Sequence, residues 1–372
     1  MPVLKRAWAE ISLDAIKQNF KTAKNAVAPG VRIMSVVKAD AYGHGDAEVA
    51  RALSAAGTDW FAVSNLDEAL RLREAGIEEP VLILGYTPPE YAGTLAQSNI
   101  SQTVFGANYA RELSREAVKS GVTVNIHIKI DTGMTRLGFV YHDSADEDAV
   151  SSVFEACALP GLFPEGIFTH FARADEAEGE AFTRLQYGLF TDILNKLSAK
   201  SLSFPLRHCC NSAAILNYPE MALDMVRPGI MLYGLAPCAK FGGILCPAME
   251  IKTVIALQKT VPPGTPISYG GTFVTQRETV LATVPLGYAD GYPRSLGGRA
   301  CMEVAGARAP IAGRVCMDQT VLDVTGIPET REGMTVSAVG GGVTLDELAS
   351  LAGTINYELC CAVSKRVPRV YK

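Results

Sequence analysis

Residues 31–45 read VRIMSVVKADAYGHG, and this stretch decides which fold class the sequence favours. Its first seven residues, Val31–Val37, are mostly apolar and β-rich, as in a strand that is buried in a parallel sheet. Lys38 follows at once, before a loop that contains a tyrosine and two glycines. The stretch therefore predicts a buried strand that ends at a polar residue.

Similar short runs recur along the chain, and stretches with helical periodicity separate them. Helices are predicted at Ala47–Ala56, Leu66–Ala75 and Ala107–Lys119, and Ser64 with Asp67 three residues later predicts an N-cap for the second. The other predicted strands are Trp60–Val63, Val81–Leu84, Gln102–Phe105, Val122–Ile130, Gly166–Thr169, Arg207–Cys209 and Met225–Arg227. Eight strands that alternate with helices predict an α/β fold, a (β/α)8 TIM barrel over residues 12–244. The competing α/β fold is a doubly wound open sheet, which the lack of a GxGxxG motif after the first strand disfavours.

The pattern changes from about Leu245 onward. Strand-like runs at Met249–Leu257, Thr279–Val284 and Thr335–Val339 are separated by turns rich in proline and glycine. We therefore expect a second, mainly β domain over residues 245–372. The segment Arg6–Ile11 would be a ninth barrel strand, so residues 1–11 are assigned to this second domain.

Composition narrows the class of protein. A chain of 372 residues favours two domains, and a net charge of −5 without a basic run predicts no nucleic-acid or membrane partner. No apolar run is long enough to span a bilayer, and the first residues lack a signal-peptide pattern, so a soluble, cytoplasmic protein is expected. The nine cysteines include no CxxC motif, which predicts reduced thiols and no metal site.

Polar residues gather where the predicted barrel strands end, which is the functional face of such barrels. Ser212 opens a helix-like SAAILN stretch, where a helix N-terminus favours an anion. Lys129 shares a strand face with His127 and points into the barrel, where a lysine is costly unless it is paired. The residues at the strand ends are Lys38, Arg136, His170, Asn211, Ser212, Arg227 and Gly229.

The segment VVKADAYGHG resembles the part of alanine racemases that carries the lysine bound to pyridoxal phosphate. From about Ala7 to Tyr371, further motifs resemble the same family in the same order: IKIDTGMTRLGF, HFARAD, HCCNSAA, RPGIMLYG, SYGGT, GYADGYPR, GRVCMDQ and INYEL. Asp40 departs from the usual Asn, and Thr135 from a common Gly or His. The resemblance implies a TIM barrel with a β domain, and pyridoxal 5'-phosphate as cofactor.

The resemblance also implies two catalytic bases. Lys38 would hold the cofactor and act as one base. Tyr269 would act as the other, from the partner subunit of a head-to-tail homodimer. Arg227, oriented by His208, would contact the pyridine nitrogen of the cofactor, and a guanidinium cannot accept a proton. The other residues implied to bind the cofactor are Tyr42, His170, Asn211, Ser212, Gly229, Ile230 and Tyr357.

For the substrate, the resemblance implies that Arg136 holds the carboxylate together with the phenolic oxygen of the cofactor. A carbamylated Lys129 would brace Arg136. Met317, with Asp318 beside it, would contact the carboxylate through its backbone amide, again from the partner chain. His44, between two glycines, is interpreted as a structural loop residue.

The expected function is therefore the interconversion of L- and D-alanine, which supplies D-alanine for peptidoglycan. A racemase for serine or for many amino acids remains an alternative, although Tyr357 at the pocket mouth favours a small substrate. A decarboxylase of similar architecture needs a carboxylate at the pyridine nitrogen, where the RPG motif stands instead. A non-catalytic pyridoxal-phosphate carrier would have no use for Tyr269.

Overall fold

The computed structural model describes residues 6–238 and 243–372, and the chain divides into two compact units. The barrel unit consists of Ala15–Ala41 and Asp46–Cys246. The β unit contains Tyr42–Gly45, Pro247–Lys372 and the described part of Met1–Asp14. Among the described helices, none combines the length and the apolar character that a bilayer crossing requires.

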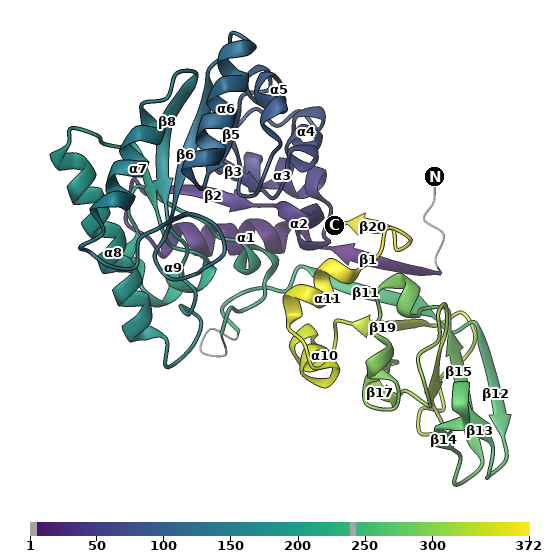
Figure 1. Ribbon diagram of the computed structural model, residues 1–372. Coiled ribbons are helices and arrows are strands. Elements are labelled where there is room, and N and C mark those ends of the chain that lie inside the picture. The colour runs from purple at the N-terminus through teal and green to yellow at the C-terminus, as the bar shows by residue number, and fades with distance from the viewer. Residues whose placement is uncertain (1–5, 239–242) are drawn as a thin grey trace. The chain divides into compact units, whose positions relative to one another are not determined.

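The barrel unit is built on eight parallel strands in the order β10-β2-β3-β4-β5-β6-β8-β9. Figure 1 labels β2, β3, β5, β6 and β8 among them. A parallel bridge between Asn211 and Arg227 joins the chain after β9 to the chain after β10, so the sheet is nearly closed. The predicted (β/α)8 barrel is therefore confirmed. The strands are β2 (Arg32–Val36), β3 (Trp60–Val63), β4 (Val81–Ile83), β5 (Ile100–Val104), β6 (Val124–Asp131), β8 (Leu162–Phe168), β9 (Leu206–His208) and β10 (Met225–Val226), with the short β7 (Phe139–Val140) beside β6.

Helices of this unit lie outside the strands, as Figure 1 shows for α3 to α8. Their buried faces are apolar: in α6 (Ala107–Lys119) the residues at one-turn spacing Ala110, Leu113 and Ala117 are fully buried. The other helices are α1 (Leu13–Asn25), α3 (Asp46–Ala55), α4 (Leu66–Glu74), α5 (Ala92–Gln97), α7 (Glu147–Cys157), α8 (Glu180–Ala199) and α9 (Ser212–Asn217). Shorter segments are the left-handed turn α2 (Lys38–Tyr42) and the 3-10 turns η1 (Pro89–Tyr91), η2 (Pro219–Met221) and η3 (Ile230–Tyr233).

The N-cap predicted for α4 was wrong by one residue. Asn65 caps the helix, and its side chain accepts a hydrogen bond from the Glu68 amide at 3.0 Å. Glu68 returns the contact, because its carboxylate accepts from the Ser64 amide at 2.7 Å. Asn65 rather than Ser64 is therefore the N-cap, and the Glu68 carboxylate binds the amide of the residue that precedes the cap.

The β unit is organised around a six-stranded sheet with the order β17-β16-β19-β11-β1-β20. In it, β1 (Ala7–Ile11) runs antiparallel to β11 (Met249–Val254) and parallel to β20 (Arg369–Tyr371). A three-stranded sheet, the β13–β14 hairpin and two helices complete the unit. The remaining elements are β12 (Leu257–Val261), β13 (Pro266–Ile267), β14 (Phe273–Val274), β15 (Thr279–Val284), β16 (Cys301–Val304), β17 (Ala307–Pro310), β18 (Thr320–Asp323), β19 (Thr335–Val339), α10 (Leu345–Ala352) and α11 (Asn356–Ala362).

The run Met249–Leu257 was predicted as one strand, and this was wrong. The chain leaves the six-stranded sheet after Val254 and enters the three-stranded sheet at Leu257. Between them, the Ile255 amide bonds to the Met334 carbonyl and the Ala256 amide to the Thr283 carbonyl. The two ends of one apolar run thus belong to different sheets. Periodicity alone does not show where such a run passes from one sheet to the next.

The loop that follows Lys38 packs within the β unit. The Gly43 carbonyl accepts from Arg369 Nε at 2.9 Å. Gly43 has a φ of +79°, and a Cβ added there would lie 2.1 Å from the Cys360 carbonyl oxygen. Only glycine fits, for two reasons at once: the left-handed backbone and the contact with α11.

We expect Gly43→Ala to lower the free energy of unfolding by more than Gly57→Ala. Gly57 has a similar φ of +87°, but an added Cβ there meets nothing within 4 Å. Both variants carry the left-handed penalty of about 1–2 kcal/mol. The contact with Cys360 should add about 1–3 kcal/mol to the Gly43 variant alone. Denaturant unfolding of the two variants measures the difference, and equal losses would contradict the close packing of this loop.

Candidate functional site

Lys38 lies directly after β2, at the start of a left-handed turn. The four residues Ala39–Tyr42 all have positive φ, between 52° and 55°, which residues other than glycine rarely adopt. The Ala41 amide donates to the Val37 carbonyl at 2.9 Å and closes the turn. Lys38 therefore stands at the C-terminal end of the parallel strands, the face where (β/α)8 barrels carry out their chemistry.

Two carboxylates of the barrel unit hold this turn in place. The buried Glu68 accepts a hydrogen bond from the Ala39 amide at 2.8 Å. Asp40 accepts from the Asp46 amide at 3.0 Å, across the rest of the loop. Sequence reasoning did not assign Glu68 to the site. Its position three residues after Asn65 could suggest a capping residue, but not a contact with the turn after Lys38.

Four predicted cations lie close enough to His170 to change its pKa. Burial is the largest cause of the lowered pKa of His170, and neighbouring positive charges lower it further. These charges belong to Arg227, Lys129, Arg136 and Lys38. Because they come from three different strands, β2, β6 and β10, the barrel brings together side chains that are far apart in the sequence. The positive side chains create a place that favours an anionic ligand.

Arg227 is the most enclosed of these cations, with 3% of its surface exposed. Burial lowers its pKa to about 10, so it remains protonated at neutral pH. Nη1 donates to His208 Nδ1 at 2.7 Å, and Nη2 donates to the carbonyls of Thr169 (2.9 Å) and Cys209 (3.1 Å) and to His170 Nδ1 (3.3 Å). The guanidinium is thus solvated by neutral acceptors, as a buried cation requires.

A chain of hydrogen bonds continues from Arg227 through the barrel interior. His208 Nε2 lies 2.9 Å from His127 Nδ1, and His127 Nε2 lies 3.3 Å from Glu165 Oε1. Because Arg227 can only donate, His208 must accept at Nδ1 and carry its proton at Nε2. His127 then accepts at Nδ1 and donates to Glu165 from Nε2. Burial is the largest cause of the lowered pKa of both histidines, which agrees with their neutral form.

His127 was predicted only to share a strand face with Lys129, and Glu165 was not singled out. No short motif links them to Arg227, since they come from β6 and β8. Only the parallel pairing of β6, β8 and β9 places the three elements side by side. The series of hydrogen bonds from Arg227 to Glu165 is therefore a tertiary feature that the local sequence does not reveal.

Lys129 is buried, as its strand position predicted, and its Nζ makes no hydrogen bond among the described atoms. Nζ lies 4.8 Å from the centre of the Phe168 ring. Burial lowers the pKa of Lys129 well below its ordinary value, and the charge of Arg227 lowers it further, while Asp131 raises it. The lowered pKa shifts the amine toward its neutral form, in which the nitrogen can react as a nucleophile.

Ser212, Gly229 and Ile230 come together between β9 and η3. Asn211 caps α9 by accepting from the Ala214 amide at 3.0 Å. The Ser212 hydroxyl oxygen accepts from the amides of Gly229 (2.8 Å) and Met231 (3.4 Å). Since its lone pairs are used, the hydroxyl proton is available to an oxygen acceptor. The first turn of η3 begins here, at Ile230.

Five predicted site residues belong to the β unit. Tyr269 begins the 3-10 turn η5 (Tyr269–Gly271) at the tip of the β13–β14 hairpin, and 71% of it is exposed in the single chain. Met317 is 53% exposed, and Asp318 forms an ion pair with Arg366 at 2.7 Å. The rings of Tyr42 and Tyr357 lie 6.3 Å apart. The predicted residues thus form two groups, one in each unit.

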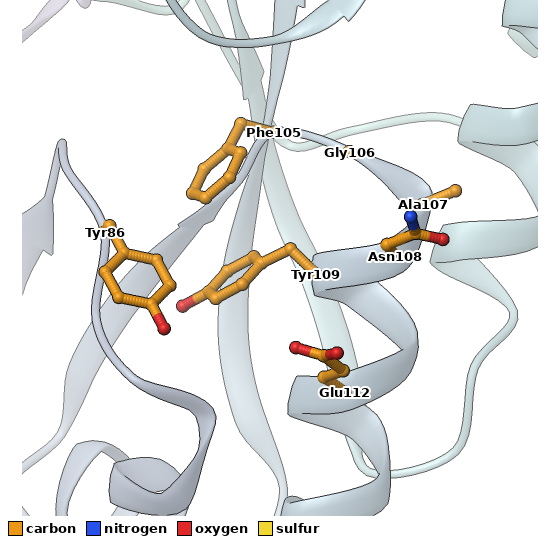
Figure 2. A pocket seen from close by; sticks show the side chains of 7 residues that line it. All are labelled: Tyr86, Phe105, Gly106, Ala107, Asn108, Tyr109 and Glu112. Carbon is orange, nitrogen blue, oxygen red and sulfur yellow. The ribbon is translucent and has the colours of Figure 1, made fainter.

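A surface pocket of about 440 Å³ lies elsewhere, next to the ends of β4 and β5 (Figure 2). Phe105 and Tyr109 stack there at 4.5 Å, and the Tyr109 hydroxyl donates to the Thr87 carbonyl at 2.7 Å. The pocket contains none of the predicted site residues, and Glu112 is the acidic group that lines it. We therefore assign the chemistry to the cation cluster around His170.

The donors of the barrel unit fit pyridoxal phosphate. A phosphate dianion matches the excess of cations and the Ser212 hydroxyl, and an aldehyde needs an amine such as Lys38. A pyridine nitrogen that accepts a hydrogen bond matches Arg227. The buried Nζ of Lys129, without a hydrogen bond among the described residues, is the feature that this ligand does not by itself explain.

Comparison with known proteins shows the family to which the chain belongs. Residues 11–237 match the family model for the alanine racemase N-terminal domain, and residues 248–371 match that for the C-terminal domain. The chain is 46% identical over 368 residues to the alanine racemase of Desulforamulus reducens, covering 98% of each chain. It is 45% identical to that of Desulfovibrio desulfuricans, covering 98% of this chain and 97% of the relative.

Solved structures give the same result. The alanine racemase of Clostridium difficile 630 matches with a TM-score of 0.94 and 38% identity, over 100% of this chain and 96% of that chain. The alanine racemase of Bacillus anthracis, solved with bound L-Ala-P, matches with a TM-score of 0.92 and 37% identity over the same shares.

The buried histidines predict a loss of stability in mild acid. Their pKa values are lowered by folding, so below the unfolded pKa of about 6.5 the unfolded chain binds more protons. The free energy of unfolding should therefore fall as the pH drops from about 6.5, by up to about 1.4 kcal/mol per unit for each histidine.

His208→Gln keeps an acceptor for Arg227 but does not titrate. Urea unfolding at pH 7.0 and pH 5.5 measures the decrease in the free energy of unfolding between the two pH values. This decrease should be smaller for the variant than for the wild type. An equal decrease in both proteins would contradict a neutral, buried His208.

Proposed function

Because the chain belongs to the alanine racemase family, we propose that it interconverts L- and D-alanine, with Lys38 and Tyr269 as the two bases. The cation cluster at the strand ends is the observation that carries this proposal. It gathers an amine, a buried guanidinium and an exposed arginine around His170. These groups suit a ligand that has a phosphate, a ring nitrogen and a carboxylate.

Pyridoxal phosphate, when bound, would withdraw electrons from the α-carbon of the substrate and so make its proton removable. Lys38 would hold the cofactor covalently. The Ser212 hydroxyl and the amides near Gly229 and Ile230 would bind its phosphate. The Gly229 amide itself donates to Ser212 Oγ, which supports the orientation of the hydroxyl proton toward such an acceptor. Tyr42, His170, Asn211 and Tyr357 are proposed to complete the cofactor site.

Arg227 would keep the pyridine nitrogen unprotonated. The guanidinium has no proton acceptor to offer, and the groups behind it, His208 and His127, are neutral. A carboxylate at this position would instead stabilise a protonated ring and a stronger electron withdrawal. Weaker withdrawal should disfavour transamination and leave proton transfer at the α-carbon as the main reaction.

Racemisation needs proton donors and acceptors on opposite faces of the α-carbon. The Lys38 amine would remove or return the proton on one face, and the Tyr269 phenol on the other. A single base would more readily return the proton to the face it left. Tyr269 and Met317 are exposed large side chains in the single chain, which supports a head-to-tail homodimer in which they reach the partner's site.

Arg136 is proposed to hold the substrate carboxylate, and Lys129 to brace Arg136 as a carbamate. Carbamylation requires a neutral amine, and burial lowers the pKa of Lys129 accordingly. A carbamate would also place a negative charge beside Arg227 and Arg136 and provide acceptors where Nζ now has no hydrogen bond among the described atoms. Met317 is proposed to contact the carboxylate through its amide, with Asp318 supporting it.

Alanine is the proposed substrate, and serine or a broader set of amino acids is the second candidate. Tyr357, whose ring lies beside Tyr42, is proposed to restrict the size of the substrate side chain. We further propose a cytoplasmic enzyme that supplies D-alanine for peptidoglycan. A carrier of pyridoxal phosphate is the least favoured candidate, because it would not need the exposed Tyr269.

Incubation with L-alanine and pyridoxal phosphate in deuterated water should give D-alanine with deuterium at the α-carbon. Tyr269→Phe should slow proton transfer mainly on one face, by about 100-fold or more, because it removes one acid–base group. Lys38→Ala should lose both the visible absorbance of the bound cofactor and the borohydride-trapped linkage.

Chiral chromatography with mass spectrometry measures both products and label. If the wild-type protein forms no deuterated D-alanine, the proposed function fails. L- and D-serine, tested in parallel, distinguish an alanine racemase from one of broader specificity.

Lys129 should carry one carbon dioxide when bicarbonate is present. Nuclear magnetic resonance with 13C-bicarbonate should show a carbamate signal in the wild type that disappears in Lys129→Gln. The glutamine cannot form a carbamate, so it serves as the matched control. A spectrum of the wild type that contains only free bicarbonate and dissolved carbon dioxide would remove the proposal for this lysine.

A further inference from the structure

Ser268 has an unusual backbone conformation directly before Tyr269. Its φ of 62° and ψ of −175° lie in a region that is essentially restricted to glycine. The two residues after Tyr269, Gly270 and Gly271, also have positive φ, but they are glycines and tolerate it. The strain in this hairpin tip is therefore concentrated at Ser268.

Ser268 is held in this conformation by its own hydroxyl group. Oγ donates to the Arg314 carbonyl at 2.7 Å, and the Cys316 sulfur lies 3.4 Å from it. The Ser268 carbonyl in turn accepts from the Gly271 amide at 3.1 Å, which closes the turn around Tyr269. The side chain and the carbonyl of one residue thus fix both ends of the turn.

The backbone around this contact leaves little room for another arrangement. A Cβ added at Gly313 would lie 2.7 Å from the Ile267 carbonyl oxygen and 2.9 Å from Ser268 Cβ. Ile267 pairs with Phe273 across the hairpin and packs with Leu281 and Ala312. The base of the hairpin is therefore anchored in the apolar cluster, and its tip rests against the segment that leads to Met317.

Tyr269 itself has little packing in the single chain, since 71% of it is exposed. A base at such a position needs support from its backbone, because small displacements of a catalytic group reduce the rate strongly. Functional sites are also where strained backbone conformations cluster. Positive φ alone does not assign a role, since Ala305 also has a φ of 52°. Ser268 differs because a side-chain hydrogen bond maintains its conformation directly before Tyr269.

We propose that Ser268 is a positioning residue for the reaction: its hydroxyl bond to the Arg314 carbonyl holds the strained turn that directs the Tyr269 phenol. This inference rests on the proposed role of Tyr269 as the second base. Ser268 acts through Tyr269 and does not itself transfer a proton.

Two variants separate the hydroxyl bond from the strain. In Ser268→Ala the native turn still requires a non-glycine residue with φ near 62°, but the hydroxyl bond that maintains this conformation is lost. The turn should therefore relax to another conformation. Ser268→Gly removes both the bond and the strain, so the turn can keep its shape at lower cost. We expect kcat to fall about 10- to 100-fold in Ser268→Ala and less in Ser268→Gly, with KM for alanine little changed.

Hydrogen exchange provides a readout that does not depend on activity. The Gly271 amide should exchange faster in Ser268→Ala than in the wild type, because its acceptor is the Ser268 carbonyl.

The visible absorbance of the bound cofactor should remain. Ala305→Gly is the matched control, since it relieves a positive φ of 52° in the same unit and should leave kcat unchanged.

A double-mutant cycle tests whether Ser268 acts through Tyr269. In the Tyr269→Phe background, Ser268→Ala should cause no further loss of kcat. A further tenfold loss there, or wild-type kcat in both single Ser268 variants, would overturn the inference. If instead Tyr269→Phe alone leaves racemisation unchanged in both directions, the proposed second base is wrong. That result differs from a failure at Ser268 alone.

Discussion

The barrel unit depends on the solvation of one buried cation, the guanidinium of Arg227. A charge with almost no exposed surface must be surrounded by acceptors, and here they are two carbonyls and two histidine nitrogens. This requirement sets the tautomers of His208 and His127, and Glu165 is the last acceptor in the series of hydrogen bonds that begins at Arg227. The tautomers of these two histidines follow from this single constraint, while burial is the largest cause of their lowered pKa values.

Strained backbone accompanies both proposed bases. Four non-glycine residues with positive φ follow Lys38, and one in a nearly glycine-only region precedes Tyr269. Each such residue costs on the order of 1–3 kcal/mol, so the surrounding structure must maintain it. Glu68 and Asp40 do so in the barrel unit, and the Ser268 hydroxyl does so in the β unit. The strained residues that lower the stability of the fold thus lie next to the two side chains whose orientation the proposed reaction needs, Lys38 and Tyr269.

Much of the architecture could be predicted from the pattern of residues. The boundaries of α6 and β3 were correct, and those of most barrel elements were correct within a few residues, because burial imposes a clear periodicity on them. The cap of α4 and the strand Met249–Leu257 were wrong. In the first case two adjacent residues can both cap a helix, and the local bond between Asn65 and the Glu68 amide selects Asn65. In the second case, pairing with a second sheet divides the run.

The sequence by itself determined the fold class, the family and the residue types at the strand ends, because these depend on local periodicity and on motifs of adjacent residues. Only the tertiary structure decided three features: the hydrogen bonds that link Arg227 to Glu165 through two neutral histidines, the contact of Glu68 with the turn after Lys38, and the bond of Ser268 to the Arg314 carbonyl. The physical reason is that hydrogen-bond partners and backbone strain depend on strand register and on contacts between distant segments. A sequence read in order does not contain those distances.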